Sequence, residues 1–188
     1  MKNLLYLLFV LPLLFGCGSD ANIDIEKLPS DQREFISQRY EAFKKYTETD
    51  NSIKKSKVYN ETRAFCCQFA SKYGYSFQNW VGIIDNIYTD RGADYVRVEI
   101  SVNPYDELAW NVEFVSQNIA MNTDLYNKIA ELDEGQEVKF DFSFNKAVDV
   151  LKASINDKCY AESNNNPITA ELNFLMTAEY PITLKDIH

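Results

Sequence analysis

The chain has 188 residues, of which 46% are hydrophobic and 14% aromatic, and its formal net charge is −9 at pH 7. This length suffices for one domain with a hydrophobic core, and the negative charge disfavours nucleic acid as a partner because phosphate backbones would repel it. The only histidine, His188, is the last residue, on a tail that we expect to be frayed. The chain therefore offers no well-placed imidazole for a zinc site or for a Ser-His-Asp triad. We predict a protein that is not an enzyme and that has no metal or other cofactor.

The first seventeen residues, MKNLLYLLFVLPLLFGC, are a short basic start followed by an apolar run that stops at Gly16-Cys17. The run is too short to span a bilayer as a stable helix, so we interpret residues 1–16 as a secretory signal peptide. Leu14-Phe15-Gly16-Cys17 resembles the bacterial lipoprotein signal, or lipobox, in which the cysteine sulfur is acylated. A cleaved signal without lipid and a buried N-terminal helix are the two alternatives.

The resemblance implies a membrane anchor at Cys17, with residues 17–29 as a lipidated polar tether. Several acyl chains on one cysteine attach a protein firmly to a membrane without spanning it. Gly18 follows the cysteine where an aspartate would resemble an inner-membrane retention signal. We therefore expect a lipid-anchored protein of the bacterial cell envelope, in the outer membrane and facing either the periplasm or the cell surface. Removal of residues 1–16 also removes Lys2, so the mature charge would be −10.

Residues 30–74 are predicted to form two N-terminal helices. Apolar residues recur in both at spacings of three and four, and Gly74 is a typical helix stop. We interpret the apolar faces as core packing rather than as a ligand site. They consist of Phe35, Ile36, Tyr40 and Phe43 in the first helix, and of Tyr59, Thr62, Cys66, Phe69 and Tyr73 in the second.

Residues 75–188 change to a period of two, which is typical of strands. The order of three strands, a short helix and two further strands is that of the OB fold, a small barrel. Gly82 in the first strand fits a bend where that strand serves both halves of the barrel. We predict an α+β, mainly β domain: a five-stranded OB-like barrel preceded by two N-terminal helices, with an unrelated α+β sandwich as the alternative. The strands are expected at 77–88, 95–102, 110–116, 136–144 and within 170–187, and the helix at 123–132.

The clearest predicted strand is QEVKFDFSF, in which Val138, Phe140, Phe142 and Phe144 face the core. Together with NWVGIIDNIY, LYNKIAELDEG and LNFLMTAEYPITLKDI, it resembles segments of uncharacterised bacterial OB-like proteins, over about residues 50–187. The resemblance implies a domain similar to the tRNA-anticodon type of OB fold. A likeness of fold does not carry a function.

OB domains bind ligands across their second and third strands, between two flanking loops. Here that face is predicted to offer Tyr95, Arg97 and Trp110, with loops at about 89–94 and 145–166. Both aromatic rings could stack on a sugar or a peptide side chain; the alternative is that they cover the N-terminal helices. We predict a non-catalytic binding module for a protein or a glycan. The alternative is a nucleic-acid or nucleotide-binding OB domain.

Three cysteines besides Cys17 allow at most one disulfide among themselves. Cys66 belongs to the apolar face of the second helix, whereas Cys67 points about 100° away from it. If a disulfide forms, we predict Cys66–Cys159 over Cys67–Cys159, and helical geometry disfavours a Cys66–Cys67 bond. The alternative is that Cys66 remains a buried thiol.

Overall fold

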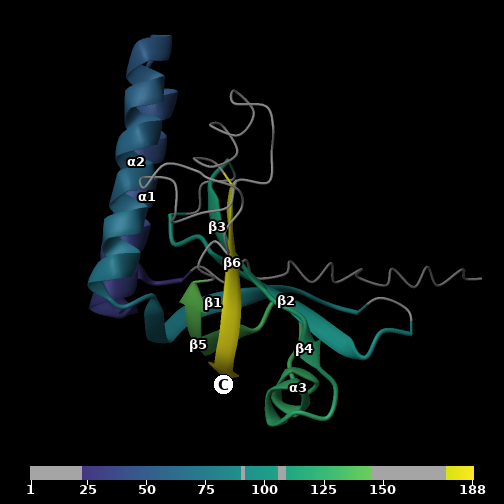
Figure 1. The fold of residues 1–188 in the computed structure, drawn as a ribbon. Coiled ribbons are helices and arrows are strands. Elements are labelled where there is room, and N and C mark those ends of the chain that lie inside the picture. The colour runs from purple at the N-terminus through teal and green to yellow at the C-terminus, as the bar shows by residue number, and fades with distance from the viewer. Residues whose placement is uncertain (1–22, 90–91, 106–108, 145–176) are drawn as a thin grey trace, which may run out of the picture.

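The computed structural model describes residues 23–89, 92–105, 109–144 and 177–188. The chain folds into a helical hairpin, α1 and α2, beside a β-barrel (Figure 1). The elements follow one another as η1 (Ile25–Lys27), α1 (Ser30–Thr47), α2 (Ser52–Lys72), β1 (Ser76–Tyr88), β2 (Tyr95–Val102), β3 (Asn111–Ser116), β4 (Ile119–Ala120), α3 (Asp124–Ile129), β5 (Glu137–Phe144) and β6 (Thr177–Ile187).

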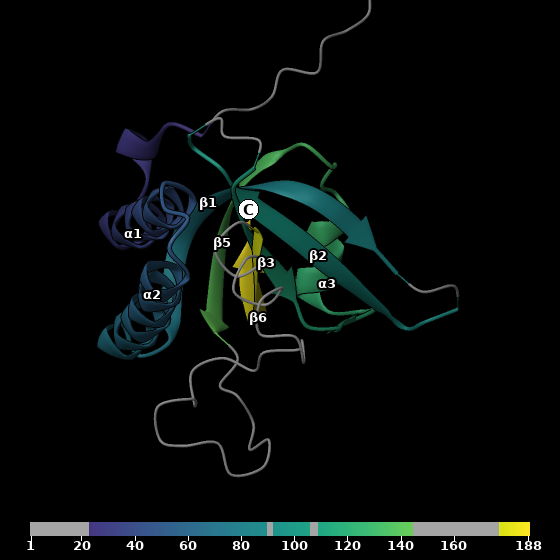
Figure 2. The same cartoon turned by 90° about the horizontal axis from the view of Figure 1, so that it is seen from above.

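Five strands close the barrel. β1 pairs antiparallel with β2 and β5, and β2 pairs antiparallel with β3. β6 closes the barrel, because it pairs parallel with β3 on one side and antiparallel with β5 on the other. Figure 2 shows the barrel from above, with the hairpin and α3 on opposite sides. The predicted five-stranded OB-like barrel with two preceding helices is confirmed. The sequence did not predict β4, which pairs with the start of β2.

Gly82 lies where β1 changes partners. Residues up to Ile83 pair with β5, and residues from Ile83 onward pair with β2. A Cβ at Gly82 would overlap Ile100 Cγ2 and would lie 3.0 Å from the Ser101 carbonyl oxygen. The absence of a side chain therefore lets β1 and β2 approach closely at the bend, which confirms the role predicted for this glycine.

The barrel interior is aromatic. Val138, Phe140, Phe142 and Phe144 of β5 are all buried, as predicted from their alternation. The rings of Phe114 on β3 and Phe142 lie 5.2 Å apart between centroids, which is a favourable separation for an aromatic pair. The outward residues Glu137 and Lys139 are exposed, so the predicted register of this strand holds.

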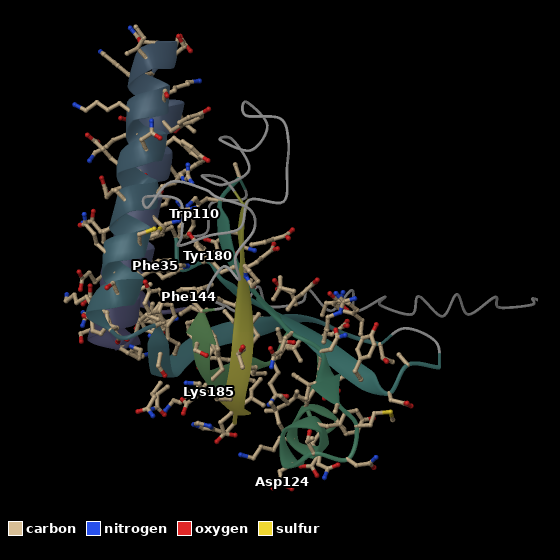
Figure 3. All side chains as sticks on the ribbon, viewed as in Figure 1. Phe35, Trp110, Asp124, Phe144, Tyr180 and Lys185 are labelled. Carbon is tan, nitrogen blue, oxygen red and sulfur yellow. The ribbon has the colours of Figure 1, made fainter. Side chains whose placement is uncertain are left out.

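The hairpin packs on the barrel at the end away from α3. Figure 3 shows Phe35 of α1 with Phe144 and Tyr180 between the hairpin and the strands. The Phe35 ring centroid lies 6.1 Å from that of Phe144 and 5.5 Å from that of Tyr180. Gln32 of α1 also donates to the Val81 carbonyl at 2.6 Å and accepts from its N–H at 2.8 Å. The helices thus extend the barrel core rather than form a second domain.

Both chain ends of the described structure are fastened to the fold. Ile23 and Leu28 are buried in the core, although both lie inside the tether predicted over residues 17–29. His188 donates its backbone N–H to Lys139 at 2.9 Å and accepts from Lys139 at 2.7 Å. The expectation of a frayed tail was therefore wrong, because the antiparallel pairing of β6 with β5 continues to the last residue.

Candidate binding face

The outward side chains of β2 and β3, with those that adjoin them at the end of β1 and at the start of β6, form the surface that we call the outer face. Its position follows from the period of two: Val96, Val98 and Ile100 point inward, so the residues between them point outward. The outer face comprises Asp85, Tyr88, Tyr95, Arg97, Glu99, Ser101, Asn111, Glu113, Val115 and Glu179.

Arg97 lies between two tyrosine rings on the outer face. Its guanidinium carbon is 4.9 Å from the centroid of Tyr88 and 6.0 Å from that of Tyr95, and Tyr88 is its cross-strand partner on β1. Cation–π contacts of this kind hold a guanidinium in place. Burial, followed by the charge of Glu99, raises the pKa of Tyr88. The structure thus brings the two predicted residues Tyr95 and Arg97 together in one Tyr88–Arg97–Tyr95 cluster.

The sequence analysis missed Tyr88. The available signal was its position as the last residue of the first predicted strand, next to the turn that flanks the OB binding face. A strand residue at that point faces the start of the next strand in an antiparallel pair. The alternation of β1 was obscured because its register shifts between Ile84 and Asn86.

A row of acidic residues crosses the outer face beside this cluster. Ser101 donates to Asp85 at 2.7 Å and is the cross-strand partner of Glu113, which in turn lies opposite Glu179. Like charges directly opposite one another destabilise a sheet. Burial is the main cause that raises the pKa of Asp85 and of Glu113, and the neighbouring carboxylates raise both further. The outer face is therefore negative and incompletely compensated by Arg97.

Trp110 does not lie on the outer face. It is only 1% exposed, and its ring centroid lies 5.3 Å from that of Tyr40 on α1 and 5.7 Å from that of Tyr105 (Figure 3). The Tyr40 and Tyr105 rings stack on each other at 3.8 Å. The prediction of Trp110 as an accessible binding residue was wrong, and the alternative, that the ring covers a helix, describes it. Burial against the hairpin removes more apolar surface from water than an exposed position would.

The two neighbouring cysteines differ in their chemistry. Cys66 is buried with its thiol 3.7 Å from the Tyr180 hydroxyl, and burial raises the pKa of this thiol. Cys67 is the disulfide-bonded residue of the two. The prediction of a Cys66–Cys159 disulfide was therefore wrong. Cys66 points inward, as expected, but this places its thiol in the core, where it stays free of a disulfide. Cys159 lies outside the described residues, as do Cys17 and the loop predicted at 145–166.

The described residues hold no group of three or more His, Cys, Asp or Glu side chains arranged to bind a metal ion. Within that part of the chain, no helix is both long enough and apolar enough to cross a membrane. Comparisons of the chain with protein-family models, with curated proteins and with solved structures found no significant match. The functional conclusion therefore depends on the residues themselves.

Proposed function

We propose that this protein is a lipid-anchored component of the bacterial cell envelope whose barrel is a non-catalytic binding module for a protein or a glycan. The outer face is the observation that carries the proposal. It combines the Tyr88–Arg97–Tyr95 cluster with the row of Asp85, Glu113 and Glu179. Aromatic rings pack against sugars and peptide side chains, and carboxylates accept hydrogen bonds from hydroxyl and amino groups.

The charge of the outer face argues against the nucleic-acid alternative. Four acidic residues, Asp85, Glu99, Glu113 and Glu179, surround the single cation Arg97 on the outer face. Nucleic-acid sites need clustered cations to displace the counterions of the phosphates. A neutral or positively charged partner fits this surface better.

The sequence of residues 1–17 supports the anchor at Cys17. The buried Ile23 lies only six residues after this cysteine, so an acylated Cys17 would hold the folded domain close to the membrane. Labelled palmitate tests this half of the proposal. Label should enter the wild-type chain and not Cys17→Ser, which should also stay unprocessed. A wild-type chain that is soluble and unlabelled would contradict the anchor.

Binding at the outer face is tested with two variants of equal charge change. Glu99→Lys alters the outer face, whereas Glu131→Lys alters an exposed position just after α3. Pull-down from envelope extracts should recover a partner with the wild type and with Glu131→Lys, and should lose it with Glu99→Lys. A glycan array probed with the same three proteins distinguishes a glycan from a protein partner. Equal binding by both variants would exclude the outer face.

A further inference from the structure

The far half of the α1–α2 hairpin projects beyond the barrel. In Figures 1 and 3 both helices continue past the described strands. This half has its own small core of Ala42, Tyr46 and Tyr59, against which Val58 packs. Asn51 is the N-cap residue of α2, and its side chain accepts hydrogen bonds from Ile53 N at 3.0 Å and Lys54 N at 3.2 Å. The end of the hairpin is thus a formed structure without support from the barrel.

Ile53 is exposed at this end, which we call the hairpin tip and define as residues 44–57. Its exposed fraction is 79%, and the only other large hydrophobic side chain exposed in the described residues is Met121, at 41%. Met121 precedes α3 by three residues, and α3 lies on the opposite side of the barrel from the hairpin (Figure 2). An isoleucine in the first turn of a capped helix is held at a defined position, so it is presented to whatever the tip contacts.

Lysines are concentrated in the hairpin tip. The tip contains five lysines and two acidic residues, a net charge of +3 in a chain whose total charge is −9. Three of the lysines are held by contacts within the hairpin: Lys44 lies 3.7 Å from Glu41, Lys55 lies 4.9 Å from the Tyr46 ring centroid, and Lys57 lies 3.7 Å from Glu61. Lys45 and Lys54 are exposed and have no ion pair among the described residues. The five are Lys44, Lys45, Lys54, Lys55 and Lys57.

We propose that the hairpin tip docks on an anionic phospholipid surface, with Ile53 entering the interface between headgroups and acyl chains. Lysines are attracted to anionic lipid headgroups, and an apolar side chain among them gains free energy by leaving water. The acidic outer face would be repelled from the same surface and therefore stays available to a partner. This proposal rests on the proposed envelope location, which supplies the membrane. It does not require that Cys17 is acylated, because the tip can contact lipid without the anchor.

The tether limits how the hairpin can meet the membrane. Ile23 is six residues after Cys17, and six residues span at most about 21 Å when fully extended. The 18 residues of α1 are about 27 Å long, and the tip is at the end away from η1 (Figure 1). An anchored chain can therefore bring Ile53 to the membrane only if the hairpin is tilted toward the bilayer surface.

A tryptophan at Ile53 makes the contact measurable in the full chain. Both native tryptophans, Trp80 and Trp110, are buried, so brominated acyl chains should quench only a newly introduced, lipid-contacting indole. Ile53→Trp is compared with the matched control Met121→Trp after purification from membranes and reconstitution. The vesicles contain phosphatidylcholine either alone or with phosphatidylglycerol. We expect several-fold stronger quenching at position 53 than at position 121, only with phosphatidylglycerol, and weaker quenching at high salt.

A charge reversal sharpens the test. Lys54→Glu in the Ile53→Trp background should lower the membrane-bound population of the tip at least about fivefold, because each basic residue near an anionic surface contributes about that factor. Lys139→Glu, an exposed position on β5, should leave the quenching unchanged. Equal quenching at positions 53 and 121, or no response to phosphatidylglycerol or to Lys54→Glu, would overturn the proposal. Palmitate labelling decides separately whether the anchor exists, so the two failures are distinguishable.

Discussion

The inner and outer faces of the barrel are built from the same strands and have opposite properties. The inner face of β5 and β3 is a continuous aromatic cluster that includes Phe114, Phe140 and Phe142. The outer face carries a cation between two tyrosines and a row of like charges. Since successive side chains of a strand point to opposite sides, stability and binding can be altered independently. The charges of the outer face therefore do not stabilise the barrel as the inner rings do, in agreement with the recognition role that we propose for this face.

Truncation of an inner-face ring should have the largest effect. Phe142→Ala removes a ring that contacts Phe77, Trp80 and Phe114, and it should lower the free energy of unfolding by about 3–5 kcal/mol. Urea denaturation measures the difference. The matched control is Lys139→Ala, an exposed change on the same strand, which should change stability by no more than about 0.5 kcal/mol. Equal sensitivity at both positions would contradict the assignment of the two faces.

A methyl group at the bend of β1 should have the next largest effect. Gly82→Ala places a Cβ against Ile100 Cγ2 and 3.2 Å from Phe140 Cε1, so β1 must move away from β2. Overpacking of this kind costs about 1–3 kcal/mol, measurable as a lower midpoint of thermal unfolding. Gly92→Ala is not a neutral control because Gly92 has a positive φ. A better control is Gln78→Ala at an exposed position near the start of β1, which should leave the midpoint nearly unchanged.

Removal of one charge from the acidic row should stabilise the protein slightly. The pKa of Glu113 is raised in the folded state, first by burial and then by Asp85 and Glu179. The folded state therefore favours the protonated Glu113 carboxyl. The free energy of unfolding falls as the pH rises from the ordinary pKa of this carboxyl through its raised pKa. Glu113→Gln should increase the free energy of unfolding at pH 7 and should make little difference in acid. Urea denaturation across this pH range would contradict the prediction if the variant were less stable at neutral pH.

The smallest effect that we expect is on the binding of nucleic acid. Because the outer face is acidic, gel shifts at physiological salt should detect no tight binding of single-stranded DNA or RNA. Reversing Glu99 and Glu113 to lysine would give the outer face the cations that it lacks, and weak, salt-sensitive binding should then appear. Submicromolar binding by the wild type, with a steep dependence on salt, would favour the nucleic-acid alternative over a protein or glycan partner.

The candidate site could be predicted only in part. Tyr95 and Arg97 follow from alternation along one strand, and they lie on the outer face as expected. Tyr88 and Glu179 join them through pairing with other strands, and a pattern within one segment cannot report which segments become neighbours. Trp110 shows the converse case: it is an even number of residues from the inward Val112 and Phe114, so alternation already argued against an outward position, and the hairpin packs against its ring.

The two long helices, the five barrel strands in their order and the inward sets of β2 and β5 followed from the sequence alone, because helical and strand periodicities are local properties of the chain. The sequence also identified Gly82 as the bend and Cys66 as an inward residue. Three features came from the folded structure: the hairpin completes the barrel core, Cys66 keeps its thiol beside Tyr180, and Arg97 lies against Tyr88 and Tyr95. These outcomes depend on contacts between segments far apart in the chain, where burial and charge are set by residues that no local pattern contains.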